Sequence, residues 1–77
     1  MIEQEVLKLL RETNDEIPDD AQVNLLAAGL IDSFDIVNIV AALEEHFGIE
    51  ISAEEIVPEN FGSVENMAAL VEKCKKQ

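Results

Sequence analysis

The sequence has few of the side chains from which catalytic sites are usually built. Its 77 residues include one histidine, one cysteine, no tyrosine and no tryptophan. Ser33 and His46 lie on one predicted helix about 20 Å apart, too far for a nucleophile and its base. Cys74 alone forms no intramolecular disulfide, and its place on a helical apolar stripe favours a small core residue. We therefore predict that the chain is not an enzyme.

Basic residues are also scarce. Five Lys and Arg stand against 17 Asp and Glu, which gives a formal net charge of −12. Binding to nucleic acids and anionic membranes depends on Lys and Arg that displace counterions, so neither is an expected partner. Proteins with basic surfaces are the expected partners. The alternative is that the acidity serves solubility alone.

Long hydrophobic runs are missing as well. No uncharged stretch reaches the length of a membrane span. The first ten residues carry Glu3, Glu5 and Lys8 where a signal peptide would need apolar side chains. We expect no membrane insertion, a cytoplasmic location and a monomer. At this length, residues 1–77 should form a single domain.

Apolar residues recur at the helical period in three predicted helices, over residues 2–13, 33–47 and 64–76. Strand-like alternation occurs only at residues 49–51, which are too few for a sheet. The expected fold is all-α, a small bundle of three long helices and one short helix. The predicted core consists of Val6, Leu9, Val37, Val40, Leu43, Phe47, Val64, Met67 and Val71.

A long loop should join the first two helices. Residues 14–24 are rich in turn-forming types, whereas residues 25–31 are apolar enough to pack on the core, with Gly29 in a turn. Asp32 is the expected N-cap of the central helix, and Gly48 is its expected C-terminal stop.

Two further serines are expected to begin helical segments. Ser52 is predicted to open a short helical turn that Pro58 ends, and Ser63 to cap the last helix. Carboxylates cluster at Asp15, Glu16, Asp19 and Asp20. They lack the spacing and the glycine of an EF-hand loop, so no metal site is predicted there.

Ser33 is the best candidate for a site of modification. It opens the central helix, where a side chain points outward beside unpaired backbone N–H groups that an attached phosphate could use. Asp32 and Asp35 would repel that phosphate, so a metal or a basic enzyme surface should screen them during attachment. The alternative is that Ser33 merely starts a helix.

The motif G-L-I-D-S-F at residues 29–34, followed by D-I-V-N-I-V-A-A-L-E-E-H-F-G-I-E-I, resembles the acyl carrier protein family, including carriers of amino acids and D-alanine. The resemblance implies that Ser33 bears a 4′-phosphopantetheine arm, that Asp32 helps to position the modifying enzyme, and that acyl or aminoacyl groups ride on the arm as thioesters. It implies as partners a phosphopantetheinyl transferase and acyl-loading, condensing or acyl-transfer enzymes. Phe34 and Asn38 stand where housekeeping fatty-acid carriers usually have other residues. We therefore expect a specialised biosynthetic pathway, for fatty acids, polyketides or another product.

The partners are expected to dock on the central helix. With Val37 and Val40 inward, Asp35, Asn38, Ala42 and Glu45 should point outward. Phe34 is either a core aromatic or an exposed apolar anchor beside the arm. The predicted docking residues are Phe34, Asp35, Asn38, Ala41 and Glu45, of which Asp35 and Glu45 would meet basic surfaces by the resemblance. The competing function is an acidic helical interaction module with an unmodified Ser33.

Overall fold

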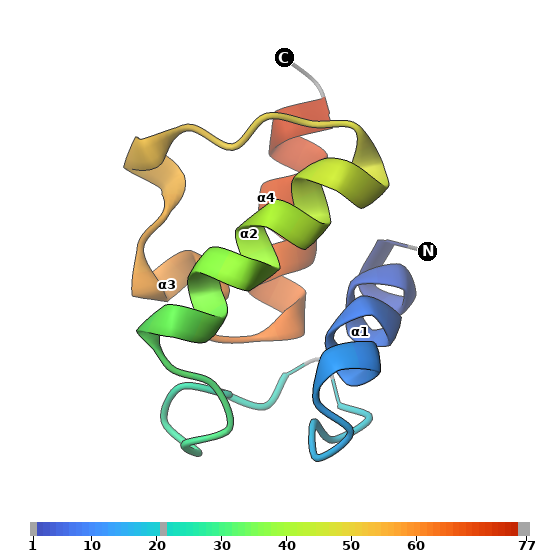
Figure 1. The fold of residues 1–77 in the computed structure, drawn as a ribbon, viewed down its shortest axis with the longest axis vertical. Coiled ribbons are helices and arrows are strands. Elements are labelled where there is room, and N and C mark those ends of the chain that lie inside the picture. Colours follow the sequence, from blue (N-terminus) through green and yellow to red (C-terminus); the bar gives the residue numbers. More distant parts are fainter. Residues whose placement is uncertain (1, 21, 76–77) are drawn as a thin grey trace.

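The computed structural model describes residues 2–20 and 22–75. Its elements in chain order are α1 (Ile2–Thr13), α2 (Ser33–Phe47), the 3-10 helix η1 (Ala53–Glu55), α3 (Pro58–Phe61) and α4 (Val64–Lys75). In Figure 1, α2 crosses the molecule between α1 on one side and α3 on the other, with α4 behind it. The described residues contain no strand, and the predicted all-α bundle of three long helices and one short helix is confirmed.

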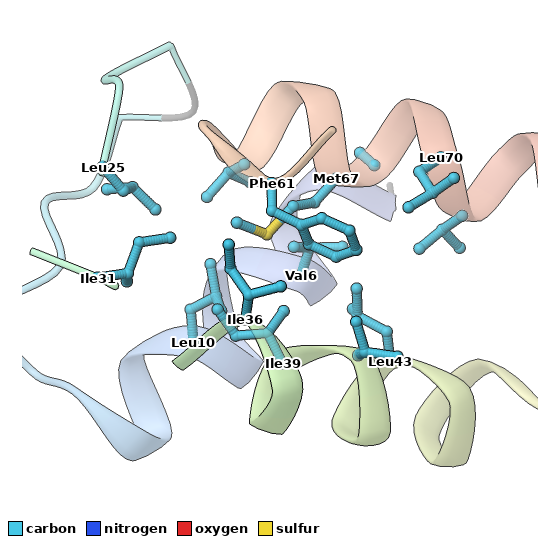
Figure 2. Close-up of a cluster of buried hydrophobic side chains, with 14 of the residues drawn as sticks. Val6, Leu10, Leu25, Ile31, Ile36, Ile39, Leu43, Phe61, Met67 and Leu70 are labelled. Carbon is cyan, nitrogen blue, oxygen red and sulfur yellow. The ribbon is translucent and has the colours of Figure 1, made fainter. Parts of the chain in front are cut away.

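One hydrophobic core joins the helices. The Phe61 side chain is fully buried and points from α3 toward Ile39 and Leu43 of α2 (Figure 2). Val6 of α1 and Met67 of α4 are also fully buried. Burying a side chain of this size stabilises the folded state by about 1.5–3 kcal/mol. The core also contains Leu10, Ile17, Leu25, Ile31, Ile36, Val40, Ile51, Val64, Ala68, Leu70 and Val71.

The loop between α1 and α2 packs on this core, as its sequence predicts. Leu25 and Ile31 are buried. The Leu25 N–H donates to the Gly62 carbonyl at 2.6 Å, and the Leu25 carbonyl accepts from the Leu30 N–H at 2.9 Å. Gly29 has a φ of 75°, a left-handed conformation that favours glycine. Buried side chains and these backbone hydrogen bonds therefore fix the end of the loop just before α2 begins.

The predicted inward face of α2 is wrong at Val37. This side chain is 65% exposed, and the buried side chains of α2 are Ile36, Ile39, Val40 and Leu43. Residues 36–40 read I-V-N-I-V, so two overlapping apolar stripes are available to one helix. Val40 and Leu43 are buried as predicted, so the buried stripe is shifted by less than one residue, toward Ile36 and Ile39. Leu9 and Phe47, also predicted for the core, are only half-buried.

The segment between α2 and α4 also differs from the prediction. The Ser52 side chain makes no capping hydrogen bond, and Pro58 begins α3 instead of ending the preceding turn. Proline suits the first position of a helix because the N–H that it lacks would have no helical partner there. The predicted helical turn is present as η1, directly after Ser52, and α3 is a second short element that was not predicted.

Three hydrogen bonds made by side chains help to hold this segment in place. The Glu44 Oε2 atom accepts from the Ile51 N–H at 2.9 Å, and the Lys73 Nζ atom donates to Glu55 Oε1 at 2.9 Å. That hydrogen bond, together with the charge of Glu55, raises the pKa of Lys73. At the far end Ser63 Oγ accepts from the Asn66 N–H at 3.1 Å, which confirms the predicted cap of α4.

Cys74 lies half-buried on α4, on the apolar stripe that its spacing predicts. Burial raises the pKa of its thiol above the usual value, and the charge of Glu55 adds to this, against a smaller opposing effect of Lys73. A raised pKa leaves less thiolate at neutral pH, so this thiol is a poor nucleophile. No helix among the described residues is long and apolar enough to cross a membrane.

Candidate functional site

A reciprocal pair of carboxylates fixes the start of α2. The Asp32 Oδ1 atom accepts from the N–H groups of Phe34 and Asp35 at 3.0 and 3.1 Å. In return the Asp35 Oδ2 atom accepts from the Asp32 N–H at 3.0 Å. Asp32 itself has the extended backbone of an N-cap, with φ −135° and ψ −172°. This capping box confirms the predicted boundary and makes Ser33 the first residue of the helix.

The capping box changes what an attached phosphate can do. The sequence suggests that the phosphate would use unpaired N–H groups at the start of the helix, but those of Phe34 and Asp35 already bind Asp32. The Ile36 N–H binds the Asp32 carbonyl at 3.1 Å. The two carboxylates also oppose a second anion at this place. A phosphate on Ser33 would therefore find the N–H groups of Phe34, Asp35 and Ile36 already occupied.

The flanks of α2 differ in what they face. Successive helical residues are about 100° apart, so Ser33, Val37 and Glu44 share one flank. Because Glu44 binds the Ile51 N–H, this flank faces the segment between α2 and α3. Ser33 is exposed at the helix start. The hydroxyl therefore has an open path to solvent on the side of α2 away from α1.

An apolar patch lies beside Ser33 on the exposed side of α2. Phe34 is 81% exposed, so it is not the core aromatic that was one of its two interpretations. Val37 and Ala41 follow it at helical spacing and are also exposed. We call these three residues the apolar patch. The sequence prediction missed Val37, although its place three residues after Phe34 is the signal that could have identified it.

The other predicted docking residues lie on two flanks. Glu45 is exposed on the outer side of α2, and Asn38 is exposed between this side and the cavity beside α1, which it also lines. Asp35 and Ala42 are only half-buried, not outward as predicted, and they face the side of α1. The Asp35 carboxylate is turned back toward the Asp32 N–H, because it is the second half of the capping box. The structure therefore separates Asp35 from the surface on which Phe34 and Glu45 lie.

His46 has a structural environment at the far end of α2. Its Nε2 atom lies 3.6 Å from Glu5 Oε1 of α1, and its ring packs edge-on against Phe47 with 4.8 Å between the centroids. It stands at the C-terminal end of the helix, where a positive charge is favourable. Ser33 lies at the opposite end of the same helix, so the two side chains form no nucleophile and base pair. Within the described ranges, no three His, Cys, Asp or Glu side chains converge as metal ligands.

Comparison with known proteins gives one consistent result. Residues 2–71 match the protein family described as "Phosphopantetheine attachment site". The chain is 31% identical to the D-alanyl carrier protein of Abiotrophia defectiva over 74 residues, which cover 94% of each chain. It is 36% identical to the probable acyl carrier protein PigG of Serratia sp. over 56 residues, or 73% of this chain and 64% of PigG. It is 45% identical to the chloroplastic acyl carrier protein 4 of Cuphea lanceolata over 64 residues, or 79% of this chain and 45% of that protein.

Removing the N-cap tests the geometry at the start of α2. We expect Asp32→Ala to lower the free energy of unfolding by about 1–2 kcal/mol and Asp32→Asn by only a few tenths, since asparagine keeps the acceptor oxygen. Urea unfolding followed by circular dichroism measures both. Asp19→Ala is the control, because Asp19 is exposed in the loop and its carboxylate caps no helix. This loss of the same charge should change the free energy of unfolding by less than about 0.5 kcal/mol. Equal effects of Asp32→Ala and Asp19→Ala would contradict the capping box.

Proposed function

Because the chain belongs to the family of carrier proteins defined by a phosphopantetheine attachment site, we propose that Ser33 bears its 4′-phosphopantetheine arm. The observation that carries this assignment is the exposed Ser33 side chain at the first residue of α2. The chain has three serines. Ser63 is buried, and its hydroxyl caps α4. Ser52 precedes η1 and is not part of the D-S motif.

The arm supplies a thiol that carries its cargo as a thioester, and the residues of this chain hold the arm in place and present it to partners. Asp32 and Asp35 fix the first helical turn, from which Ser33 would present the arm. Tethering raises the effective concentration of the cargo at each partner's active site. We infer that the chain catalyses no step itself. The cargo is an acyl or aminoacyl group, since acyl and D-alanyl carriers are both among its relatives.

The partners are a phosphopantetheinyl transferase and enzymes that load, extend or transfer the cargo. We propose that they dock on the apolar patch of Phe34, Val37 and Ala41, with Glu45 and Asn38 at its rim. Phe34 would be the buried anchor of such an interface. Charge steers the encounter, because a chain of net charge −12 attracts basic surfaces. A cytoplasmic location stays a prediction from the N-terminal residues.

Loading the arm tests the assignment of Ser33. We expect the apo chain, incubated with coenzyme A, magnesium and a broad-specificity phosphopantetheinyl transferase, to gain the mass of one phosphopantetheine in an intact-mass measurement. Ser33→Ala should gain nothing because the hydroxyl is gone, and Ser52→Ala should be loaded like the wild type. A mass gain that persists in Ser33→Ala would show that the arm is attached to another residue. No gain in the wild type would show that the chain accepts no arm.

The apolar patch predicts a separation of stability from docking. Phe34→Ala should change the free energy of unfolding by less than about 1 kcal/mol, because the ring is exposed in the free chain. The same substitution should lower kcat/KM for transfer from the loaded arm by about tenfold, since an aromatic anchor is lost from the interface. Phe61→Ala is the matched control, and loss of this core ring should cost about 3–5 kcal/mol. Unchanged transfer by Phe34→Ala would show that partners bind elsewhere.

A further inference from the structure

The Leu30 carbonyl, which lies shortly before Ser33 in the chain, accepts a hydrogen bond from a side chain at the end of α1. The donor is the Nδ2 atom of Asn14, at 3.1 Å, and the bond is partly buried. Asn14 lies directly after α1, and its N–H donates to the Leu10 carbonyl at 2.9 Å. One amide side chain therefore joins the end of the first helix to the backbone that leads into Ser33.

A second hydrogen bond fixes the orientation of the Asn14 side chain. Its Oδ1 atom accepts from the Glu16 N–H at 3.0 Å, which is the local turn that asparagine favours. A carboxamide has one oxygen and one NH₂ group, so an oxygen bound by Glu16 leaves the NH₂ group for Leu30. An aspartate at this position would keep the bond to Glu16 and lose the donor to Leu30.

The backbone that receives the Asn14 bond is a closed loop. We give this name to residues 25–31, whose ends meet because the Leu25 carbonyl accepts from the N–H groups of Leu30 and Ile31, at 2.9 and 3.4 Å. On the side of α3 the loop is attached through the Leu25 N–H, which donates to the Gly62 carbonyl at 2.6 Å. On the side of α1 it is attached through the Leu30 carbonyl. The closed loop is therefore anchored by hydrogen bonds at two places.

A cavity borders the closed loop on the side of α1. It has a volume of about 270 Å³, it lies between α1, this loop and α2, and both Asn14 and Ile31 are in its lining. Protein cores normally contain few voids, and groups that line one lack contacts on that side. Packing therefore opposes a movement of the Ile31 backbone toward α1 only weakly, and the Asn14 bond supplies the missing restraint.

We propose that Asn14 is a positioning residue for the modification of Ser33. This rests on the proposed function, in which a phosphopantetheinyl transferase attaches the arm there. In that reaction the Ser33 oxygen bonds to the phosphorus that bears the pantetheine of coenzyme A. The bridging P–O bond breaks, adenosine 3′,5′-bisphosphate leaves, and the transferase takes up the hydroxyl proton. A misplacement of about 1 Å can slow such a reaction about a hundredfold.

Asn14 acts on the part of the chain that the capping box does not reach. The hydrogen bonds between Asp32 and Asp35 fix Ser33 relative to α2. Asn14 fixes the closed loop relative to α1. Together they give the backbone on the two sides of Ser33 a single arrangement for the transferase to bind. Without Asn14 this arrangement is populated for part of the time, and the apparent affinity falls by that fraction.

The kinetics of loading test this role. The concentration of the apo chain is varied at saturating coenzyme A and magnesium with a broad-specificity phosphopantetheinyl transferase. We expect Asn14→Ala to raise KM for the chain about fivefold and to leave kcat within about twofold, because a correctly arranged chain reacts normally once bound. Asn14→Asp should raise KM as much, since it keeps the bond to Glu16 and lacks the donor. Gln4→Glu adds the same charge at an exposed position of α1 and should leave KM unchanged.

Asn60→Ala is the control for stability. It removes another partly buried bond from an asparagine to a backbone carbonyl, between Asn60 Nδ2 and Glu55 at 2.7 Å. This variant and Asn14→Ala should lower the urea midpoint by similar amounts, whereas Asn60→Ala should keep the wild-type KM. Amide hydrogen exchange in the apo chain adds a measurement that needs no arm. Asn14→Ala should speed exchange of the Leu30 and Ile31 N–H groups about tenfold.

Three results would overturn the proposal. An equal rise of KM in Asn60→Ala and Asn14→Ala would show that loading follows overall stability. A wild-type KM in Asn14→Asp would show that the donor to Leu30 has no part in loading. Normal loading of the wild type, with unchanged exchange at Leu30 and Ile31 in Asn14→Ala, would overturn the role of Asn14 alone. A wild-type chain that takes up no arm would instead overturn the proposed function, and the modification with it.

Discussion

The hydrogen bonds exchanged by Asp32 and Asp35 are the constraint on which the site depends. They set the first residue of α2 and hold the Asp35 carboxylate against the Asp32 N–H. Packing of Ile36 in the core then leaves Phe34 pointing to solvent. The exposed position of Ser33 therefore results from the capping box, which places it in the first turn, together with the packing of α2.

The rotation divides α2 into flanks with separate uses. One flank presents Ser33 toward the segment before α3, the outer side presents the apolar patch of Phe34, Val37 and Ala41, and the third borders the cavity with α1. The fourth side of α2 packs in the core and consists of Ile36, Ile39, Val40 and Leu43. A partner that covers the outer side can reach both neighbouring flanks. A small domain can in this way offer several contacts around a single helix.

The fold was predictable from the sequence where Asp32, Gly48 and Ser63 mark the ends of α2 and the start of α4, because these residues act locally. The bounds of α1 were predictable from its apolar period instead, and the cap predicted at Ser52 is absent. The side of α2 that faces the core was not predictable, because the run I-V-N-I-V offers two apolar stripes. Only packing decides whether Ile36 or Val37 is buried. A proline can either end a helical turn or begin the next helix, and the sequence alone does not distinguish the two. In the structure Pro58 begins α3, whose Phe61 is buried in the core. The cavity could not be foreseen, because its lining comes from segments far apart in the chain.

The central claim is that the capping box stays closed when Ser33 is loaded, so that the phosphate of the arm does not take over the N–H groups of Phe34 and Asp35. Nuclear magnetic resonance couplings across hydrogen bonds test it in ¹³C,¹⁵N-labelled apo and loaded chains. The account predicts couplings from the amide nitrogens of Phe34 and Asp35 to the carboxyl carbon of Asp32 in both forms. Loss of these couplings on loading, with couplings from the same nitrogens to phosphorus in their place, would contradict it.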